Sequence, residues 1–496
     1  MEHPSGQSLN ANEVAIHSNT SSIILSYSLF RRSSAARRGK GSSIFIVTET
    51  EINEVWTLIQ SVLLISLILT FVVIMLFEFR NRSVSLVLWA GLFIFFLIPH
   101  VIDIVTRSDN YEESTFARAS LFALLFNVFY LSSRIFIESN CKHLRNVPYE
   151  DEFRSPRSIV SPKREDLFIV ALFALLTIAV CCLFYFIKST LGDLLSFTWI
   201  DMFENQGGIL FGIFSYLFSM TIPLLFISYK YKHRSIFIGS LVMMSLVLFV
   251  FRIRAFLIPI TIPFILSYIY GKKFKLNIRN IGATIVGSVL IVYSIFGIQV
   301  LKIYGTLGNF ISSISFSEFN RTIYGLLFSR FGEFGLRNAF YYFIENDNNF
   351  SNFGLGLGYR RLLLLPLPSS MSLGIKPQDF AMDMAYAYDP VNSVVGVNSM
   401  HPTLYGDCYA NFGWYGVLLG VFWAIFSSIS DMLTKDTKET VLRTSLFVSC
   451  AYAFTLIARG AVYNGTFNVF FILITHYVLW ITIGIVANGV NLERRA

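Results

Sequence analysis

The chain has 496 residues, of which 54% are hydrophobic and only 14% charged, and its formal net charge is +8. Because soluble domains carry about 25% charged residues, this composition excludes a soluble globular protein, and the 50 Phe residues exclude a disordered one. Five scattered cysteines without a CxxC pair exclude a disulfide scaffold, and we assign the positive excess to cytosolic loops rather than to nucleic-acid binding. We therefore predict an all-α polytopic membrane protein.

Residues 1–56 form an N-terminal tail before the first long apolar run, which begins too late for a cleavable signal peptide. The tail is rich in serine and contains five basic residues, Arg31, Arg32, Arg37, Arg38 and Lys40. Three interpretations stay open: the tail is disordered, it contains one further membrane crossing, or the translation start is placed too far upstream.

Eleven apolar runs have the length of transmembrane helices, which need about 20 mostly apolar residues. Such runs cannot be barrel strands, which alternate in polarity and are about half as long. Eight runs lie in residues 57–301 and three in residues 411–487, and residues 488–496 form a C-terminal tail. The runs are 57–77, 83–105, 116–137, 167–187, 208–229, 235–251, 255–270, 281–301, 411–430, 442–458 and 467–487. We expect 11 or 12 transmembrane helices, depending on the N-terminal tail.

Lys and Arg residues in the connections predict the orientation of these helices, since basic residues are retained in the cytosol. One set of alternate connections holds 19 of them, whereas the other short connections hold only five: Arg107, Lys188, Arg252, Arg254 and Arg459. We therefore place the first set, which includes Arg494 and Arg495 of the tail 488–496, in the cytosol. The long segment 302–410 then lies outside, which is the periplasm if the envelope is Gram-negative.

Arg252 and Arg254 stand in "LFVFRIRAFLIPITIPF", between two short apolar runs. Charge at this depth in a membrane is costly and usually faces a cavity or a partner. Since residues i and i+2 of a helix point about 200° apart, we expect only one of the two to bind an anion, with a preference for Arg254. An ion pair with an acidic residue elsewhere in the chain is the alternative.

The external segment 302–410 is far longer than the usual connection between helices, and such loops usually carry function. Five of its seven basic residues are arginines, which suit bidentate phosphate recognition. Arg330 and Arg337 are seven residues apart, so on one helix they return to within about 20° of the same face. We expect both to contact one anion. The alternative is an interfacial helix whose arginines reach lipid headgroups.

His401 and Asp407 stand just before the next apolar run. Pro favours the first position of a helix, so Pro402 predicts His401 as the N-cap of the helix that becomes this span. The helix dipole would keep the imidazole neutral and able to accept a proton near pH 7. We expect Asp407, six residues later, to orient His401 or to act as the base itself. A simple hydrogen-bonded cap is the alternative for His401.

Motifs for metals and nucleotides are missing from the sequence, which contains no HExxH, DxD, Walker loop or GxSxG elbow. The closely spaced glycines of "FGLGLGYRRLL" do not follow a strand pattern, so a dinucleotide site is not expected there. We therefore predict chemistry without a metal or another cofactor, based on arginine cations and a histidine base.

The layout of about a dozen spans with one large external loop late in the chain resembles the O-antigen polymerases, also called oligosaccharide repeat unit polymerases, and more distantly the O-antigen ligases. The motifs that carry the resemblance are "FRIRAFL", "SRFGEFGLR", "LPLPSS…GIKP" and "HPTLYGDCYANFGWYGV". The last is the most specific, because His-Pro-Thr followed by an acidic residue and "NFGWYG" is typical of the family. At Pro366–Ser369 the chain departs from the pattern: many members have Arg after the proline, whereas here Arg360 and Arg361 precede it.

The resemblance implies a GT-C-like glycosyltransferase of the bacterial inner membrane that acts in lipopolysaccharide biosynthesis. Its donor is an undecaprenyl diphosphate-linked glycan, its acceptor is a sugar hydroxyl on another lipid-linked repeat unit, and its protein partner is a polysaccharide chain-length regulator. The candidate site residues are His401 and Asp407 for catalysis, Arg252, Arg254, Arg330 and Arg337 for the diphosphate, and Arg360, Arg361 and Tyr405 for the glycan.

Two other functions fit the same layout. A ligase would transfer the finished glycan to the lipid A core, and the "GIKP…HPTLYGD" pattern favours the polymerase over it. A flippase for lipid-linked glycans would carry out no chemistry. We expect a flippase to show charged residues through several spans and short loops on both sides, so the long external segment argues against it.

Overall fold

The computed structural model describes residues 49–106, 111–140, 162–191, 209–251, 257–271, 315–328, 335–365, 374–390, 399–436 and 440–493, together with the single positions 286, 293, 297, 300, 367 and 372. The chain divides into two units, Met1–Val55 and Trp56–Ala496, and the fold below is that of the second. Within the described residues all regular elements are helical. This confirms the all-α prediction for that part of the chain.

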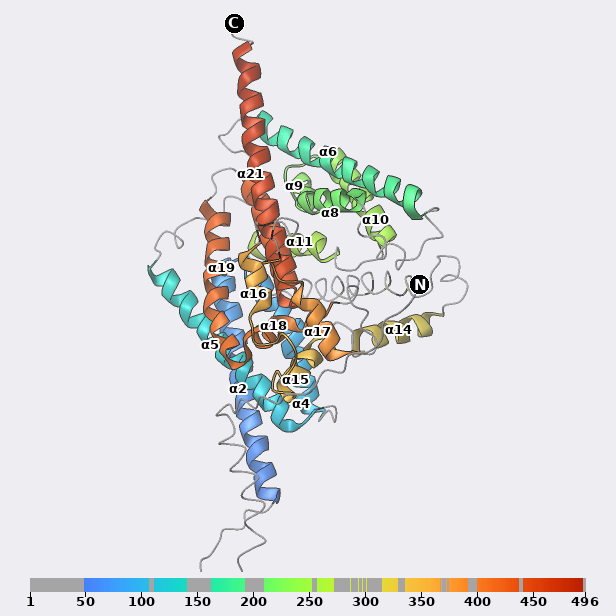
Figure 1. Ribbon diagram of the computed structural model, residues 1–496. Coiled ribbons are helices and arrows are strands. Elements are labelled where there is room, and N and C mark those ends of the chain that lie inside the picture. The colour runs from blue at the N-terminus through green and yellow to red at the C-terminus, as the bar shows by residue number, and fades with distance from the viewer. Residues whose placement is uncertain are drawn as a thin grey trace, which may run out of the picture. The chain divides into compact units, whose positions relative to one another are not determined.

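The helices of the first half, drawn from blue to green in Figure 1, consist mostly of apolar residues. A π-helical turn, Phe93–Leu97, joins Leu86–Leu92 and Ile98–Val105 into one continuous helical segment. The elements are α2 (Glu49–Arg80), α3 (Leu86–Leu92), α4 (Ile98–Val105), α5 (Glu113–Asn140), α6 (Pro162–Phe186), α8 (Ile209–Thr221), α9 (Leu224–Lys230), α10 (Arg234–Phe251) and α11 (Leu257–Gly271).

In the described part of the second half, short helices come first and long helices follow. Four short helices, α15 to α18, contact one another and are grouped together in Figure 1. The elements are α14 (Phe316–Phe328), α15 (Leu336–Glu345), α16 (Leu357–Leu363), α17 (Phe380–Tyr388), α18 (Thr403–Phe412), α19 (Leu419–Asp436), α20 (Thr440–Ala458) and α21 (Val462–Glu493). A 3-10 turn, Gly413–Leu418, connects α18 to α19.

Eight helical segments of the described chain are long and apolar enough to cross a membrane, which supports a multi-pass membrane protein. They are Leu58–Arg80, Leu86–Val105, Glu113–Asn140, Arg164–Thr190, Ile213–Lys230, Thr403–Lys435, Val441–Ala458 and Val462–Val486. Each coincides with one of the eleven predicted runs. The runs 235–251 and 255–270 correspond to the shorter helices α10 and α11, and the run 281–301 lies outside the described residues apart from single positions.

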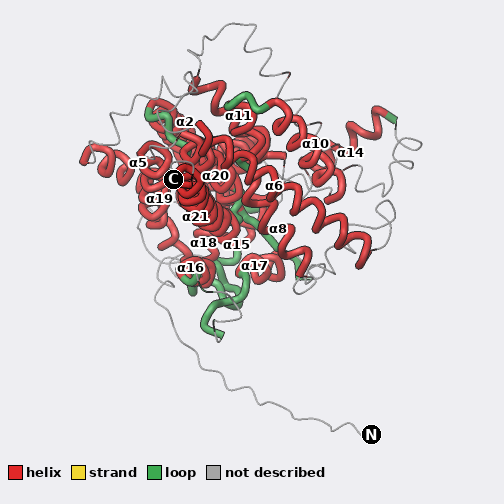
Figure 2. Tube along the Cα trace, turned by 90° about the horizontal axis from the view of Figure 1, so that it is seen from above, coloured by secondary structure: helices red, strands yellow, loops and turns green. Residues whose placement is uncertain are grey.

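Helix α20 lies at the centre of the packing (Figure 2). In its apolar segment 94% of the residues are buried, against 22% in the segments of α2 and α21. It contacts α3, α11, α19 and α21, and side chains of α20 belong to both hydrophobic clusters of the core. Since α2 and α21 expose apolar side chains such as Leu69 and Ile485, we assign those faces to the lipid.

A buried ion-pair cluster joins three helices at their ends. Arg134 of α5 donates from Nε to Glu78 Oε1 of α2 at 3.0 Å and forms a second ion pair with Asp431 of α19. The three side chains are between 0% and 3% exposed. Arg134 also donates to the hydroxyl of Ser428 at 2.8 Å, and Tyr130 donates to Glu78 at 2.8 Å. A charge within a span is thus compensated by nearby acids.

Candidate functional site

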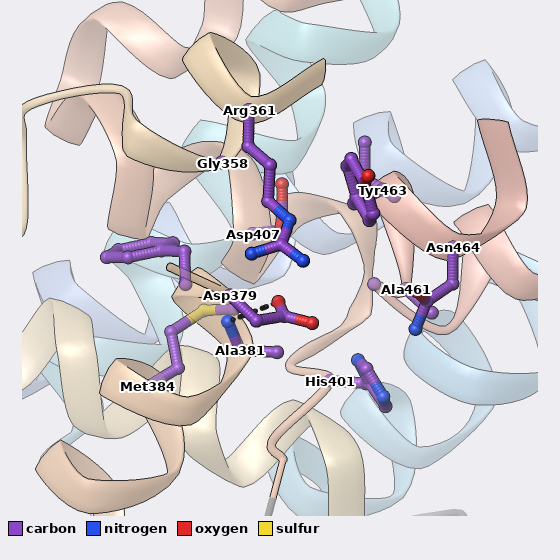
Figure 3. A pocket seen from close by; sticks show the side chains of 13 residues that line it. Gly358, Arg361, Asp379, Ala381, Met384, His401, Asp407, Ala461, Tyr463 and Asn464 are labelled. Carbon is purple, nitrogen blue, oxygen red and sulfur yellow. Dashed lines mark hydrogen bonds between the residues drawn. The ribbon is translucent and has the colours of Figure 1, made fainter. Parts of the chain in front are cut away.

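A cavity of about 360 Å³, counting space open to solvent, lies where α16, α17, α18 and the beginning of α21 meet (Figure 3). Its polar lining comes from segments that are far apart in the sequence. The lining residues are Gly358, Arg361, Asp379, Phe380, Ala381, Met384, His401, Asp407, Gly460, Ala461, Val462, Tyr463 and Asn464. Three sequence-predicted candidates, Arg361, His401 and Asp407, therefore line one cavity.

His401 lies just before α18, but it is not the N-cap of that helix. The helix begins at Thr403, and Pro402 occupies the capping position without a side-chain hydrogen bond. The prediction of His401 as N-cap is therefore wrong, and the argument that the helix dipole keeps its imidazole neutral loses its structural basis. The imidazole Nε2 lies 3.4 Å from the hydroxyl of Ser399, and Figure 3 shows the ring at the side of the cavity.

Close contact with the turn before α21 fixes the backbone after His401. The N–H of Thr403 donates to the carbonyl of Arg459 at 3.0 Å, and Thr403 has a φ of 65°. Gly460 has a φ of 95°, and a Cβ at this position would lie 2.8 Å from the carbonyl oxygen of Thr403. Only glycine fits such a position without strain. This contact brings the His-Pro-Thr motif beside Tyr463 and Asn464.

Asp407 projects into the cavity from α18 and is only 6% exposed. Asn411, one turn later, donates to the backbone carbonyl of Asp407 at 2.9 Å and approaches its Oδ1 at 3.4 Å. The side-chain oxygen of Asn411 in turn accepts from the N–H of Gly358 at 2.8 Å. Asn411 therefore holds the acidic residue and the start of α16 together.

The glycine-rich stretch before α16 serves as a docking segment against α18. The N–H groups of Gly354 and Gly356 donate to the carbonyls of Ala410 and Asn411 at 2.9 and 2.8 Å. Gly356 has a φ of 64°, and a Cβ there would lie 2.6 Å from the ring of Phe412. The spacing of these glycines thus reflects close helix packing. This packing places Arg361 of α16 at the cavity.

Arg361 of α16 points into the cavity (Figure 3). Its Nη1 donates to the carbonyl of Pro377 at 3.1 Å, and its guanidinium lies 4.5 Å from the ring centre of Tyr463. Lys376 lies 5.6 Å from the same ring and donates to the carbonyl of Leu367 at 2.8 Å. Among the described residues Arg361 has no carboxylate partner, so its charge is available to an anionic ligand.

Asp379, Tyr463 and Asn464 line the cavity but were not predicted as site residues. Asp379 is the N-cap of α17, and its Oδ1 accepts from the N–H of Ala381 at 3.2 Å. The sequence does contain a signal for Asp379, because an acidic residue directly before an apolar helical stretch is a typical N-cap. The sequence around Tyr463 and Asn464, at the start of the last span, did not indicate that these residues would line the same cavity.

Arg337 is placed away from the cavity, in a polar cluster between α15 and α4. Its Nε and Nη2 each donate to the carboxylate of Asp103 at 2.5 Å. Burial by itself would lower the pKa of the Arg337 guanidinium, but the hydrogen bonds and the charge of Asp103 raise it. Nearby, the ring nitrogens of the buried His100 lie 2.6 and 2.7 Å from the hydroxyls of Tyr341 and Ser120. Arg337 is thus compensated within the protein.

The other candidates do not line the cavity or lie outside the described chain. Tyr405 is fully buried in the core, and its hydroxyl donates to Asn127 at 2.7 Å. Arg360 is exposed on α16. Arg252, Arg254 and Arg330 lie outside the described residues. Helix α15 begins at Leu336 with Gly335 as its N-cap, so the prediction that Arg330 and Arg337 lie on one helix is wrong.

The cavity contains one permanent cation, two carboxylates, one imidazole, one phenol and one amide. Such a set can bind an anion at the guanidinium and accept a proton at the imidazole or a carboxylate. In the part of the chain that the structure describes, no three His, Cys, Asp or Glu residues are grouped as metal ligands would be. Comparisons with protein-family models, with curated proteins and with solved structures give no match.

Proposed function

We propose that this protein is a glycosyltransferase of the O-antigen polymerase kind, which joins undecaprenyl diphosphate-linked repeat units on the periplasmic side of the bacterial inner membrane. The observation that carries the proposal is the convergence of Arg361, His401 and Asp407 on one cavity. All three residues lie in the segment 302–410, which the sequence indicates as the functional part, and His401 and Asp407 belong to the motif "HPTLYGDCYANFGWYGV" that resembles the polymerase family. The GT-C-like fold is part of the same proposal.

The cavity chemistry fits the transfer of a sugar from a diphosphate. Negative charge develops on the leaving diphosphate, and a preorganised guanidinium such as that of Arg361 stabilises it in the transition state. A histidine base that accepts the proton of the attacking hydroxyl typically contributes 10²–10⁴-fold to a rate. Two lipid-tethered reactants held in one cavity supply a further contribution from proximity. In this mechanism Arg361 binds the diphosphate and His401 is the base.

The position of the cavity along the chain also agrees with an external active site. The candidate spans Thr403–Lys435 and Val462–Val486 begin beside it. Their other ends lead to Lys435 and to the basic residues Arg494 and Arg495, which the positive-inside rule assigns to the cytosol. The cavity then opens where flipped lipid-linked glycans are presented, and where a chain-length regulator would contact the enzyme.

Deletion of the gene followed by gel analysis of the lipopolysaccharide tests the proposal. We expect the loss of the long-chain ladder with a single capped repeat unit retained. Retention of the ladder would refute it. Loss of every repeat unit would identify a ligase or a flippase instead.

Substitution of His401 tests the chemistry in the same assay. We expect His401→Ala to abolish the ladder while single capped units remain, because no other imidazole lines the cavity in the described residues. Immunoblotting of membrane fractions controls for the amount of protein. A normal ladder from this variant would remove His401 from the mechanism.

A further inference from the structure

Asp379 differs from a simple helix cap in its surroundings. One oxygen of its carboxylate accepts a hydrogen bond from the N–H of Ala381 at 3.2 Å. The side chain is directed into the cavity (Figure 3). Asp407 lines the same cavity, so two carboxylates share it with one guanidinium. Two like charges in one partly buried site repel each other. A helix cap alone does not require this arrangement, since serine and asparagine cap as well as aspartate does.

None of the three charged cavity residues forms an ion pair among the described residues. Elsewhere in the described chain the buried arginines Arg134 and Arg337 are each held by a carboxylate. Arg361, Asp379 and Asp407 are thus left to act on a ligand with both anionic and hydroxyl groups. A sugar diphosphate with an incoming sugar alcohol has both, since its phosphates attract Arg361 and its hydroxyls donate to carboxylates.

Asp379 and Asp407 are suited to different tasks. Asp407 is 6% exposed and is held by Asn411 one turn away on its own helix. Asp379 is half-buried, and only one of its oxygens accepts a hydrogen bond within the described protein. In Figure 3 its carboxylate lies between the guanidinium of Arg361 and the ring of His401. A hydroxyl that approaches His401 therefore meets Asp379 rather than the more enclosed Asp407.

We propose that Asp379 is a further catalytic residue, which accepts a hydrogen bond from the acceptor sugar and orients its attacking hydroxyl toward His401 and the anomeric carbon. This inference rests on the proposed function. In the step, the acceptor oxygen forms a bond to the anomeric carbon and its proton passes to His401. The bond from that carbon to the diphosphate breaks, and undecaprenyl diphosphate leaves with the electron pair beside Arg361.

The variants Asp379→Asn and Asp379→Ser separate this role from helix capping, because both residues cap helices well but carry no charge. The matched control is Asp383→Asn, one turn further along α17. Asp383 does not line the cavity, and its carboxylate accepts from Asn352 at 3.4 Å. Each variant is purified as the full chain in nanodiscs and supplied with lipid-linked repeat units extracted from the deletion strain.

We expect the polymerisation rate to fall about 10²-fold in both Asp379 variants, the size of loss that follows when a reacting group is misplaced by about 1 Å. Asp383→Asn is expected to keep the wild-type rate. Stabilisation of the protein by added undecaprenyl diphosphate, measured as a thermal shift, should be unchanged in the Asp379 variants and lost in Arg361→Ala. If Asp379 were only a helix cap, its substitution would lower both the melting temperature of the protein and the thermal shift caused by undecaprenyl diphosphate.

A wild-type rate in Asp379→Asn, or a melting temperature that falls with the rate, would overturn the role of Asp379 and leave the proposed function intact. If the wild-type protein makes no polymer from the extracted lipids and undecaprenyl diphosphate does not stabilise it, the proposed function itself fails. The two failures are therefore distinguishable in one set of measurements.

Discussion

Arg361 and Arg337 carry the same charge but differ in what surrounds it. The guanidinium of Arg337 is held by Asp103 through two hydrogen bonds of 2.5 Å. Arg361 donates only to a backbone carbonyl and lies against the ring of Tyr463, with no carboxylate partner in the described chain. The guanidinium of Arg361 therefore keeps N–H donors and a positive charge that can bind an external anion. Under the proposed function, Arg361, which the sequence suggested for the glycan, is therefore the described arginine that we propose for the diphosphate.

Replacing Arg361 by lysine tests this assignment. The ammonium keeps the charge and can still lie against Tyr463, but the forked pair of donors is lost. We expect at least a tenfold lower polymerisation rate and a smaller thermal shift with undecaprenyl diphosphate. The matched control is Arg118→Lys, since Arg118 pairs with Asp347 away from the cavity. Equal behaviour of the two variants would show that Arg361 contributes only charge.

At the scale of the helical elements, the packing of α16 against α18 decides where the cavity residues lie. Two backbone hydrogen bonds and the side chain of Asn411 tie the glycine-rich segment to the C-terminal end of α18. This arrangement requires the close approach of Gly356 to Phe412. The position of Arg361 therefore depends on a residue without a side chain.

Substitution of Gly356 by alanine probes this docking. The φ of 64° and the 2.6 Å approach of a Cβ to Phe412 both oppose the change. We expect a destabilisation of roughly 1–3 kcal/mol, seen as a lower melting temperature, and a loss of activity. Gly354→Ala is the matched control, because Gly354 also has a positive φ, of 77°, but nothing lies within 4 Å of its Cβ position. Equal effects would mean that backbone strain, and not contact with Phe412, is responsible.

The ion-pair cluster of α2, α5 and α19 leads to a prediction about the stability of the protein. Arg134→Met leaves Glu78 and Asp431 buried without a cation, and removing one partner of a buried pair typically costs about 3–5 kcal/mol. We expect little folded protein in nanodiscs, measured by size-exclusion chromatography and thermal unfolding. Arg118→Met, which breaks an ion pair with an exposed acid, should have little effect.

Neutralising the acids provides the rescue for this cluster. Combining Arg134→Met with Glu78→Gln and Asp431→Asn removes the uncompensated charges, so we expect part of the stability to return. A stable Arg134→Met single variant would show that the cluster does not hold the three helices together.

At the scale of the whole molecule, the described unit is built around one enclosed helix. In the apolar segment of α20 94% of the residues are buried, whereas in those of α2 and α21 only 22% are. The mean hydropathy of the three segments is 2.8 in α2, 1.6 in α20 and 2.3 in α21, so hydropathy predicts that each crosses the membrane. Hydropathy does not distinguish a helix enclosed by protein from one that faces lipid, since both surroundings are apolar.

The site was predictable residue by residue but not as a whole. His401, Asp407 and Arg361 were candidates because of their residue types and local motifs. Asp379, Tyr463 and Asn464 escaped prediction because nothing in their immediate sequence indicates which neighbours they meet. The N-cap role of His401 was predicted wrongly: the helix begins at Thr403, one residue later than the proline suggested, and the N–H of Thr403 donates to the carbonyl of Arg459.

The sequence by itself determined the membrane class and the apolar helices, because these follow from local composition and the thickness of a bilayer. The basic residues of the connections add a prediction of the orientation. Only the tertiary structure decided which charges are compensated. Asp103 lies 234 positions before Arg337 in the chain, yet its carboxylate is hydrogen-bonded to the guanidinium of Arg337. Ion pairing depends on distance through space. The same reason left Arg361, Asp379 and Asp407 to be recognised as a group only after the chain was folded.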